Sequence, residues 1–234
     1  MTSHPPSQTR HNRILRVIQY GITVVYPVLL TLIAAKLVMT PLFLQLEYNR
    51  PGFPPDIYGF TREDRLMYAP YALDYLLNGA NISYLRDLRF RDGGALFNAN
   101  ELQHMEDVKA LTTVAFSGAW IAGLGALSAS ILWLWKPATH HIFRKALLYG
   151  SVLTLLLIAA IVVAAIVNWD YFFTGFHTLF FESGTWRFAY SDTLIRLFPE
   201  QFWFDAALTI GGLVAGSALL TLAFTQWWRG DHDI

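Results

Sequence analysis

Long apolar stretches alternate with polar segments along the chain. Four of them are long enough to cross a bilayer, which takes about 20 helical residues; they are residues 17–44, 110–135, 146–168 and 204–226. The third carries no charged residue at all. The pattern therefore predicts an all-α membrane protein, in which four transmembrane helices carry a small extracytoplasmic segment packed on their outer face.

The distribution of basic residues orients these helices. Residues 1–16 hold three arginines and no acid, and the loop 136–145 holds three basic residues and no acid. Because cytoplasmic loops are enriched in Lys and Arg, we expect both, and with them the tail 227–234, in the cytoplasm. Segments 45–109 and 169–203 then face outward. The first apolar run is too long for a signal peptide and lacks a clear cleavage site, so we expect it to be retained as an anchor.

Two helix starts are visible in the first outer segment, residues 45–109. Thr61 and Asp64 have the spacing of a capping box. Asn98 is placed to cap a second helix, with Glu101 at its third position, and no breaker separates that helix from the second span. The segment is too short for an independent core, so we expect it to pack on the membrane face of the helices.

The second outer segment, residues 169–203, is dominated by aromatic side chains. Aromatic rings gather at the headgroup level of a bilayer, so we expect this segment to lie in the interface. Its first part alone holds ten of them: Trp169, Tyr171, Phe172, Phe173, Phe176, Phe180, Phe181, Trp186, Phe188 and Tyr190.

Composition excludes several classes of protein. Only 15% of the residues are charged, against about 25% in soluble domains, and the mean hydropathy is +0.37. The net charge is zero, which argues against a nucleic-acid partner. The chain has no cysteine, which excludes disulfides, thiol catalysis and lipidation of the protein itself. No G-x-S-x-G motif occurs, which argues against a serine hydrolase.

Two of the seven histidines fall in the outer segments. His104 lies six residues before the second span, and His177 lies in the aromatic segment. Ionisable groups at this depth are costly unless they are used, and imidazole titrates near neutral pH. We expect the two histidines to converge in a cleft at the outer interface, open sideways to lipid and lined by aromatic side chains of residues 169–190, among them Phe176 and Trp186, and by Lys109.

Other interpretations of these residues stay open. Glu101 and Asp107 each lie three residues from His104, so either can share its helix face and orient its ring. Alternatively, Glu101 only caps the helix, Asp107 is solvated, and both His104 and His177 are interfacial polar residues. These side chains and Glu182 lack the H-x-x-x-H or H-E-x-x-H spacing of zinc sites, so we expect no metal and no cofactor.

Four blocks spread over nearly the whole chain carry a resemblance to a known family. They are Glu47-Tyr48 with Tyr58-Gly59-Phe60; Leu96-Phe97-Asn98 with Glu101-Leu102, His104-Met105 and Asp107-Val108-Lys109; Phe176-His177 with Phe180-Phe181 and Trp186; and Asp192-Thr193-Leu194-Ile195 with Pro199. Together they resemble the lipoprotein intramolecular transacylase family, four-helix integral membrane proteins of bacteria. The E-L-x-H-M-x-D-V-K block is the most specific of the four.

The resemblance implies a multi-pass acyltransferase of the bacterial plasma membrane that takes part in lipoprotein maturation, with its active site at the outer leaflet. Its substrates would be diacylglyceryl-modified lipoproteins embedded in membrane lipid. The acyl chain at sn-2 of the diacylglyceryl group would move to the α-amino group of the N-terminal cysteine, giving the lyso-form. The catalytic histidines of the family match His104 and His177. A tyrosine suspected of assisting in the first span matches either Tyr20 or Tyr26.

The residues suit that chemistry. An O-to-N acyl transfer needs a base for the amine and an acid for the leaving alkoxide, and one or two imidazoles supply both. Amide products are more stable than esters, so no ATP is needed. Two alternatives remain at this point: a non-enzymatic membrane scaffold whose outer segments bind a partner, and a metal-dependent lipid hydrolase, which the ligand spacing disfavours.

Overall fold

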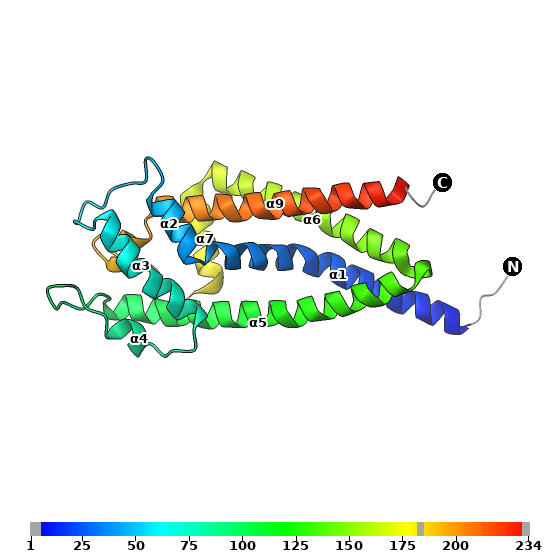
Figure 1. The fold of residues 1–234 in the computed structure, drawn as a ribbon, viewed down its shortest axis with the longest axis horizontal. Helices are drawn as coiled ribbons and strands as arrows, with labels where there is room; N and C mark the ends of the chain where they lie inside the picture. The colour runs from blue at the N-terminus through cyan, green and yellow to red at the C-terminus, as the bar shows by residue number, and fades with distance from the viewer. Residues whose placement is uncertain (1–5, 182–184, 231–234) are drawn as a thin grey trace. The chain divides into compact units, whose positions relative to one another are not determined.

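Four long helices dominate the structure, a computed structural model that describes residues 6–181 and 185–230. They are α1 (Pro6–Val38), α5 (Ala99–Trp135), α6 (His140–Val167) and α9 (Glu200–Gly230) (Figure 1). Each contains or adjoins a stretch long and apolar enough to cross a membrane. Over the described residues the β-pairing amounts to one isolated antiparallel bridge, between Arg89 and Ala95. The predicted all-α fold with four spans is confirmed.

The first predicted span does not continue as one helix to residue 44. Helix α1 ends at Val38, and after two intervening residues a separate helix, α2 (Pro41–Tyr48), begins. Thr40 stands between them in an extended conformation, and its hydroxyl accepts a hydrogen bond from the Phe43 N–H. Proline disfavours helical backbone in the residue before it, so the Thr40-Pro41 pair is the signal for the break.

The described residues form two compact units, and the long helices contribute to both. The first unit takes α1 up to Ala34, the α5–α6 hairpin from Ser117 to Val163, and α9 from Gly211. Its buried apolar cluster is Ile22, Trp133, Ile142 and Ala146. This unit consists mainly of the apolar parts of the four long helices.

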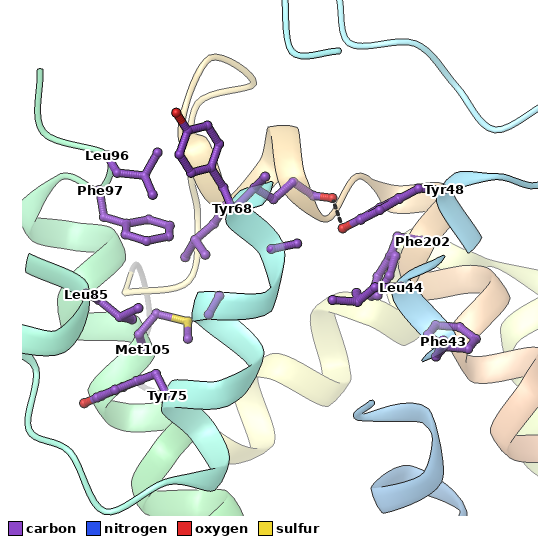
Figure 2. Close-up of a cluster of buried hydrophobic side chains, with 14 of the residues drawn as sticks. Phe43, Leu44, Tyr48, Tyr68, Tyr75, Leu85, Leu96, Phe97, Met105 and Phe202 are labelled. Carbon is purple, nitrogen blue, oxygen red and sulfur yellow. Dashed lines mark hydrogen bonds between the residues drawn. The ribbon is translucent and has the colours of Figure 1, made fainter. Parts of the chain in front are cut away.

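The second unit, Ala35–Phe116 with Ala164–Ile210, contains the remaining described α-helices, whereas a short 3-10 helix, η1 (Pro137–Thr139), belongs to the first unit. The remaining α-helices are α2, α3 (Arg62–Leu77), α4 (Ser83–Arg86), α7 (Trp169–Phe180) and α8 (Thr193–Leu197). Figure 2 shows part of its apolar core, which joins residues of the first outer segment to others near α8 and the start of α9; the core includes Leu44, Tyr75, Leu85, Leu96, Met105, Leu194, Leu197 and Phe202. The first outer segment therefore has no core of its own, and residues 194–206 complete it.

Polar bonds reinforce this shared core. The hydroxyl of Tyr48, labelled in Figure 2, donates to the carbonyl oxygen of Leu197 at 2.9 Å. The buried guanidinium of Arg65 donates to the carbonyl oxygens of Pro54 and Arg196. Because buried polar groups cost stability unless they are paired, these bonds fix α8 against the first outer segment.

Both predicted helix starts are present. Thr61 and Asp64 form a reciprocal capping box at the start of α3. At the start of α5 the Asn98 side chain accepts from the Glu101 N–H, and the Glu101 carboxylate accepts from the Asn98 N–H. Helix α5 then continues without interruption to Trp135.

Candidate active site

Glu101 fixes the beginning of the helix that carries His104. Besides the capping bond, its second carboxylate oxygen accepts the Leu194 N–H at 2.6 Å, and the residue is only 1% exposed. The same carboxylate therefore closes the α5 cap and ties α5 to α8. Its described hydrogen bonds are all accepted from backbone N–H groups, which agrees with the capping interpretation, and none of them joins it to His104.

His177 lies near the end of α7, a helix that the sequence analysis did not predict. Asn168 caps α7 by accepting the Tyr171 N–H. The Nδ1 atom of His177 lies 2.8 Å from the Phe173 carbonyl oxygen, one helical turn earlier. A carbonyl oxygen only accepts, so Nδ1 carries the proton, and in the neutral ring Nε2 holds the lone pair.

Burial affects the charge of this imidazole. It lowers the pKa of His177 from its ordinary value, and the hydrogen bond to the Phe173 carbonyl opposes that shift only in part. The neutral ring is therefore the stable form at neutral pH. A neutral imidazole with a fixed tautomer, whose Nε2 has no hydrogen bond to any described residue, is suited to accept a proton.

The two histidine rings lie close together. Their centroids are 6.5 Å apart and their planes differ by 26°, although the residues are 73 positions apart in the sequence. At this separation the two imidazoles belong to one site. The predicted convergence of His104 and His177 is confirmed.

Aromatic side chains enclose this pair. The ring of His104 meets the edges of Phe181 and Phe188 at centroid distances of 5.0 and 5.4 Å. The ring of His177 lies 4.8 Å from Trp186; its other aromatic contacts are with Phe173, Phe176 and Phe181. Phe176 and Trp186 were predicted to line the cleft, and both touch His177.

Phe173 and Phe181 belong to the aromatic residues expected to line the cleft but were not singled out, although the sequence holds a signal for Phe173. They lie four residues before and four residues after His177. That spacing places Phe173 and His177 on one face of a helix, so a helical prediction for residues 169–180 would have found Phe173. Phe181 follows the helix as its C-cap, in an extended conformation.

The other predicted site residues make different contacts. Asp107 accepts a hydrogen bond from the Gln103 side chain at 3.1 Å and has none to His104 among the described residues. The ammonium group of Lys109 donates to the Ala80 carbonyl oxygen at 2.5 Å and lies over the Tyr75 ring. Lys109 also lines an open cavity of about 490 Å³ that includes neither histidine in its lining.

Tyr26 belongs to the first unit. Its hydroxyl donates to Thr221 at 2.7 Å, and its ring packs against Gly150. Within the described residues, these contacts give Tyr26 a packing role between α1, α6 and α9.

The described residues contain no group of three or more His, Cys, Asp or Glu side chains placed to hold a metal ion. Glu182, the remaining carboxylate considered as a ligand, lies outside the described residues. The described groups at the site are thus two imidazoles and their aromatic surroundings.

Comparison with known proteins assigns the chain to a family. The model of the family described as "Lipoprotein intramolecular transacylase Lit" matches residues 18–203, most of the chain. The chain belongs to the lipoprotein intramolecular transacylase family. It is therefore an acyltransferase, and the prediction of an enzyme is confirmed over that of a scaffold.

Individual relatives agree with this assignment. An uncharacterized protein of Aquifex aeolicus (strain VF5) is 27% identical over 197 residues, which cover 83% of this chain and 87% of that protein. The membrane-integral transacylase Lit of Bacillus cereus has a similar structure, with a TM-score of 0.78 and 21% identity over 94% of this chain and 98% of that one.

A variant of the Bacillus cereus protein in which a histidine is replaced by arginine is also similar, with a TM-score of 0.70, 19% identity and 96% coverage of both chains. At these identities the structural match establishes the fold. Together with the four apolar helices, it identifies a multi-pass membrane protein of the transacylase family.

Proposed function

We propose that this transacylase moves the acyl chain from the sn-2 oxygen of a diacylglyceryl-modified lipoprotein to the α-amino group of its N-terminal cysteine, with His104 and His177 as the acid–base residues. The observation that carries the proposal is the pair of half-buried imidazoles, whose ring centroids are 6.5 Å apart. The fixed tautomer of His177 supports the roles that we propose within the pair.

His177 acts as the base. Its Nε2 takes a proton from the amine as the nitrogen bonds to the ester carbonyl carbon. The bond between that carbon and the glyceryl oxygen then breaks, and the imidazolium returns the proton to the glyceryl oxygen. His104 faces the same reacting group from the other side and hydrogen-bonds the leaving oxygen. No proton is consumed overall, so the two rings are ready for another turnover.

Much of the rate acceleration comes from the substrate itself. The amine and the ester belong to one molecule, so holding them in the reacting geometry replaces a bimolecular encounter with an internal one. The amide product is more stable than the ester, which provides the driving force. The reaction as proposed uses no cofactor.

The proposed location follows from the chemistry of the substrate. We place the histidine pair at the outer leaflet, with both termini in the cytoplasm, and the aromatic segment at headgroup depth. The acyl chains then stay in the hydrocarbon while the peptide stays in water. A lateral opening suits this arrangement, because each methylene exposed to water costs about 0.8 kcal/mol.

Mass spectrometry of lipoprotein N-termini tests the proposal. The gene is expressed in a bacterial host whose lipoproteins otherwise keep a free amine on the diacylglyceryl cysteine. We expect the parent protein to give monoacylglyceryl, N-acylated cysteine, and His104→Asn and His177→Asn to give none at equal expression.

His141→Asn is the matched control, because His141 is exposed at the start of α6 and belongs to the first unit. It should leave the product unchanged. Unmodified amines in cells that express the parent protein well would refute the reaction, and full activity in both histidine variants would refute the site.

A further inference from the structure

Two buried nitrogen atoms in the wall of the histidine site have no hydrogen-bond partner among the described residues. They are Nδ1 of His104 and Nε1 of Trp186. Buried polar groups in folded proteins are nearly always paired, so an unpaired one needs an explanation. One explanation is that the group forms its hydrogen bond only with a bound substrate.

The two atoms differ in chemistry. The imidazole Nδ1 carries either a proton or a lone pair, depending on the tautomer, and no described bond fixes the tautomer of His104. The indole Nε1 of Trp186 always carries a hydrogen and only donates. Trp186 thus presents a permanent donor that no described acceptor uses.

The indole ring is held firmly beside the base. Trp186 is only 9% exposed, and its ring centroid lies 4.8 Å from that of His177. The edge of Phe173 packs against it at 6.4 Å, and the guanidinium group of Arg187 lies over the ring at 5.2 Å. A donor fixed in this way needs little reorganisation when a substrate arrives, which is the property of an effective oxyanion donor.

We propose that Trp186 is a catalytic residue whose indole N–H donates a hydrogen bond to the carbonyl oxygen of the substrate ester while that oxygen carries negative charge. The inference rests on the proposed function. As the amine nitrogen bonds to the carbonyl carbon, an electron pair moves onto the carbonyl oxygen, where the indole N–H stabilises it. When the bond to the glyceryl oxygen breaks, the pair returns to form the amide carbonyl, and the indole keeps its proton throughout.

Two replacements of Trp186 test the inference with the purified full-length enzyme in detergent micelles. The probe is a synthetic lipopeptide with an N-terminal diacylglyceryl cysteine, and the product is quantified by mass spectrometry. Trp186→Phe keeps an aromatic ring and removes the N–H group. Incorporation of 3-benzothienylalanine at position 186 preserves the bicyclic shape and replaces the N–H with sulfur.

Both replacements should lower kcat about 100-fold, a typical loss for an oxyanion donor, and leave KM within about threefold of the parent. Loss of packing alone would instead affect the smaller phenylalanine and spare the benzothienyl side chain. Trp203→Phe is the control for the same chemical change elsewhere in the second unit. Trp203 is 45% exposed and contacts Phe198 and Phe202, so this variant should keep the parent kcat.

The outcomes separate the two proposals. A benzothienyl enzyme with a kcat within about threefold of the parent overturns the role of Trp186, whatever Trp186→Phe does, and leaves the histidine mechanism standing. Inactive His104→Asn and His177→Asn enzymes beside it would confirm that the failure concerns Trp186 only. Full activity in those histidine variants would instead refute the proposed function.

Discussion

Replacement of Glu101 tests whether this carboxylate stabilises the folded protein or orients the imidazole ring of His104. Its two oxygens accept the N–H groups of Asn98 and Leu194, and the side chain is almost fully buried. A hydrogen bond to a charged group contributes about 1.5–3 kcal/mol. In Glu101→Ala the Asn98 N–H, at the exposed start of α5, can donate its hydrogen bond to water instead. The buried Leu194 N–H is left without an acceptor.

We therefore expect Glu101→Ala to lose about 2–4 kcal/mol of unfolding free energy. For a chain of this size 1 kcal/mol shifts Tm by about 2–4 °C, so Tm should fall by about 4–16 °C. The measurement is thermal unfolding of the purified protein in detergent, followed by intrinsic tryptophan fluorescence. Glu106→Ala is the matched control, because Glu106 is exposed on the same helix, and its Tm should stay within about 2 °C.

Kinetics measured well below Tm complete the test. If Glu101 only fixes α5 to α8, the folded Glu101→Ala enzyme should keep kcat within about fivefold of the parent. A Tm equal to that of the parent would refute the stabilising role. A kcat reduced as far as in His104→Asn, without any change in Tm, would instead show that the carboxylate orients the ring.

Three further predictions concern separate parts of the molecule. Asp107→Asn should lower kcat/KM by less than about threefold and leave expression intact, because Asp107 has no described bond to His104; a loss as large as that of His104→Asn would contradict this. In a pH profile, log(kcat/KM) should fall with unit slope below about pH 8 as the substrate amine protonates. The slope should increase to two only below about pH 6.5. Burial lowers the pKa of His177, so its base form persists until the pH falls through that lowered pKa. A second change of slope between about pH 6.5 and pH 8 would refute this prediction. Gly150→Ala should cost about 1–3 kcal/mol of stability in a thermal-shift assay, because an added Cβ lies 3.0 Å from the ring packed there, whereas Gly212→Ala, with nothing within 4 Å, should have little effect.

Much of the fold could be predicted because its signals are local. A membrane span is encoded by its own apolar residues, and the caps at Thr61 and Asn98 depend on side chains only three residues away. Helix α7 was not predicted, although its signal is also local. Its aromatic residues suggested an interface, and their number obscured the four-residue spacing that places Phe173 and His177 on one helical face.

The site was only partly predictable because its contacts join distant segments. The sorting of histidines by side of the membrane selected His104 and His177, and their ring centroids lie 6.5 Å apart. One hydrogen-bond partner of Glu101 is a backbone N–H that lies 93 residues away in the sequence, and no local pattern indicates such a bond. For the same reason Lys109 was grouped with the histidines by its place in a motif, although its ammonium group bonds the backbone of Ala80.

The shared core of the second unit has a consequence for synthesis of the protein. Leu85, Leu96 and Met105 pack in one cluster with Leu194 and Leu197, so the cluster cannot close until the ribosome has added about 100 further residues. At about 5–20 residues per second this delay lasts about 5–20 s. During that time the apolar side of the first outer segment has no final partner, so the nascent chain depends on lipid or on a chaperone to cover it.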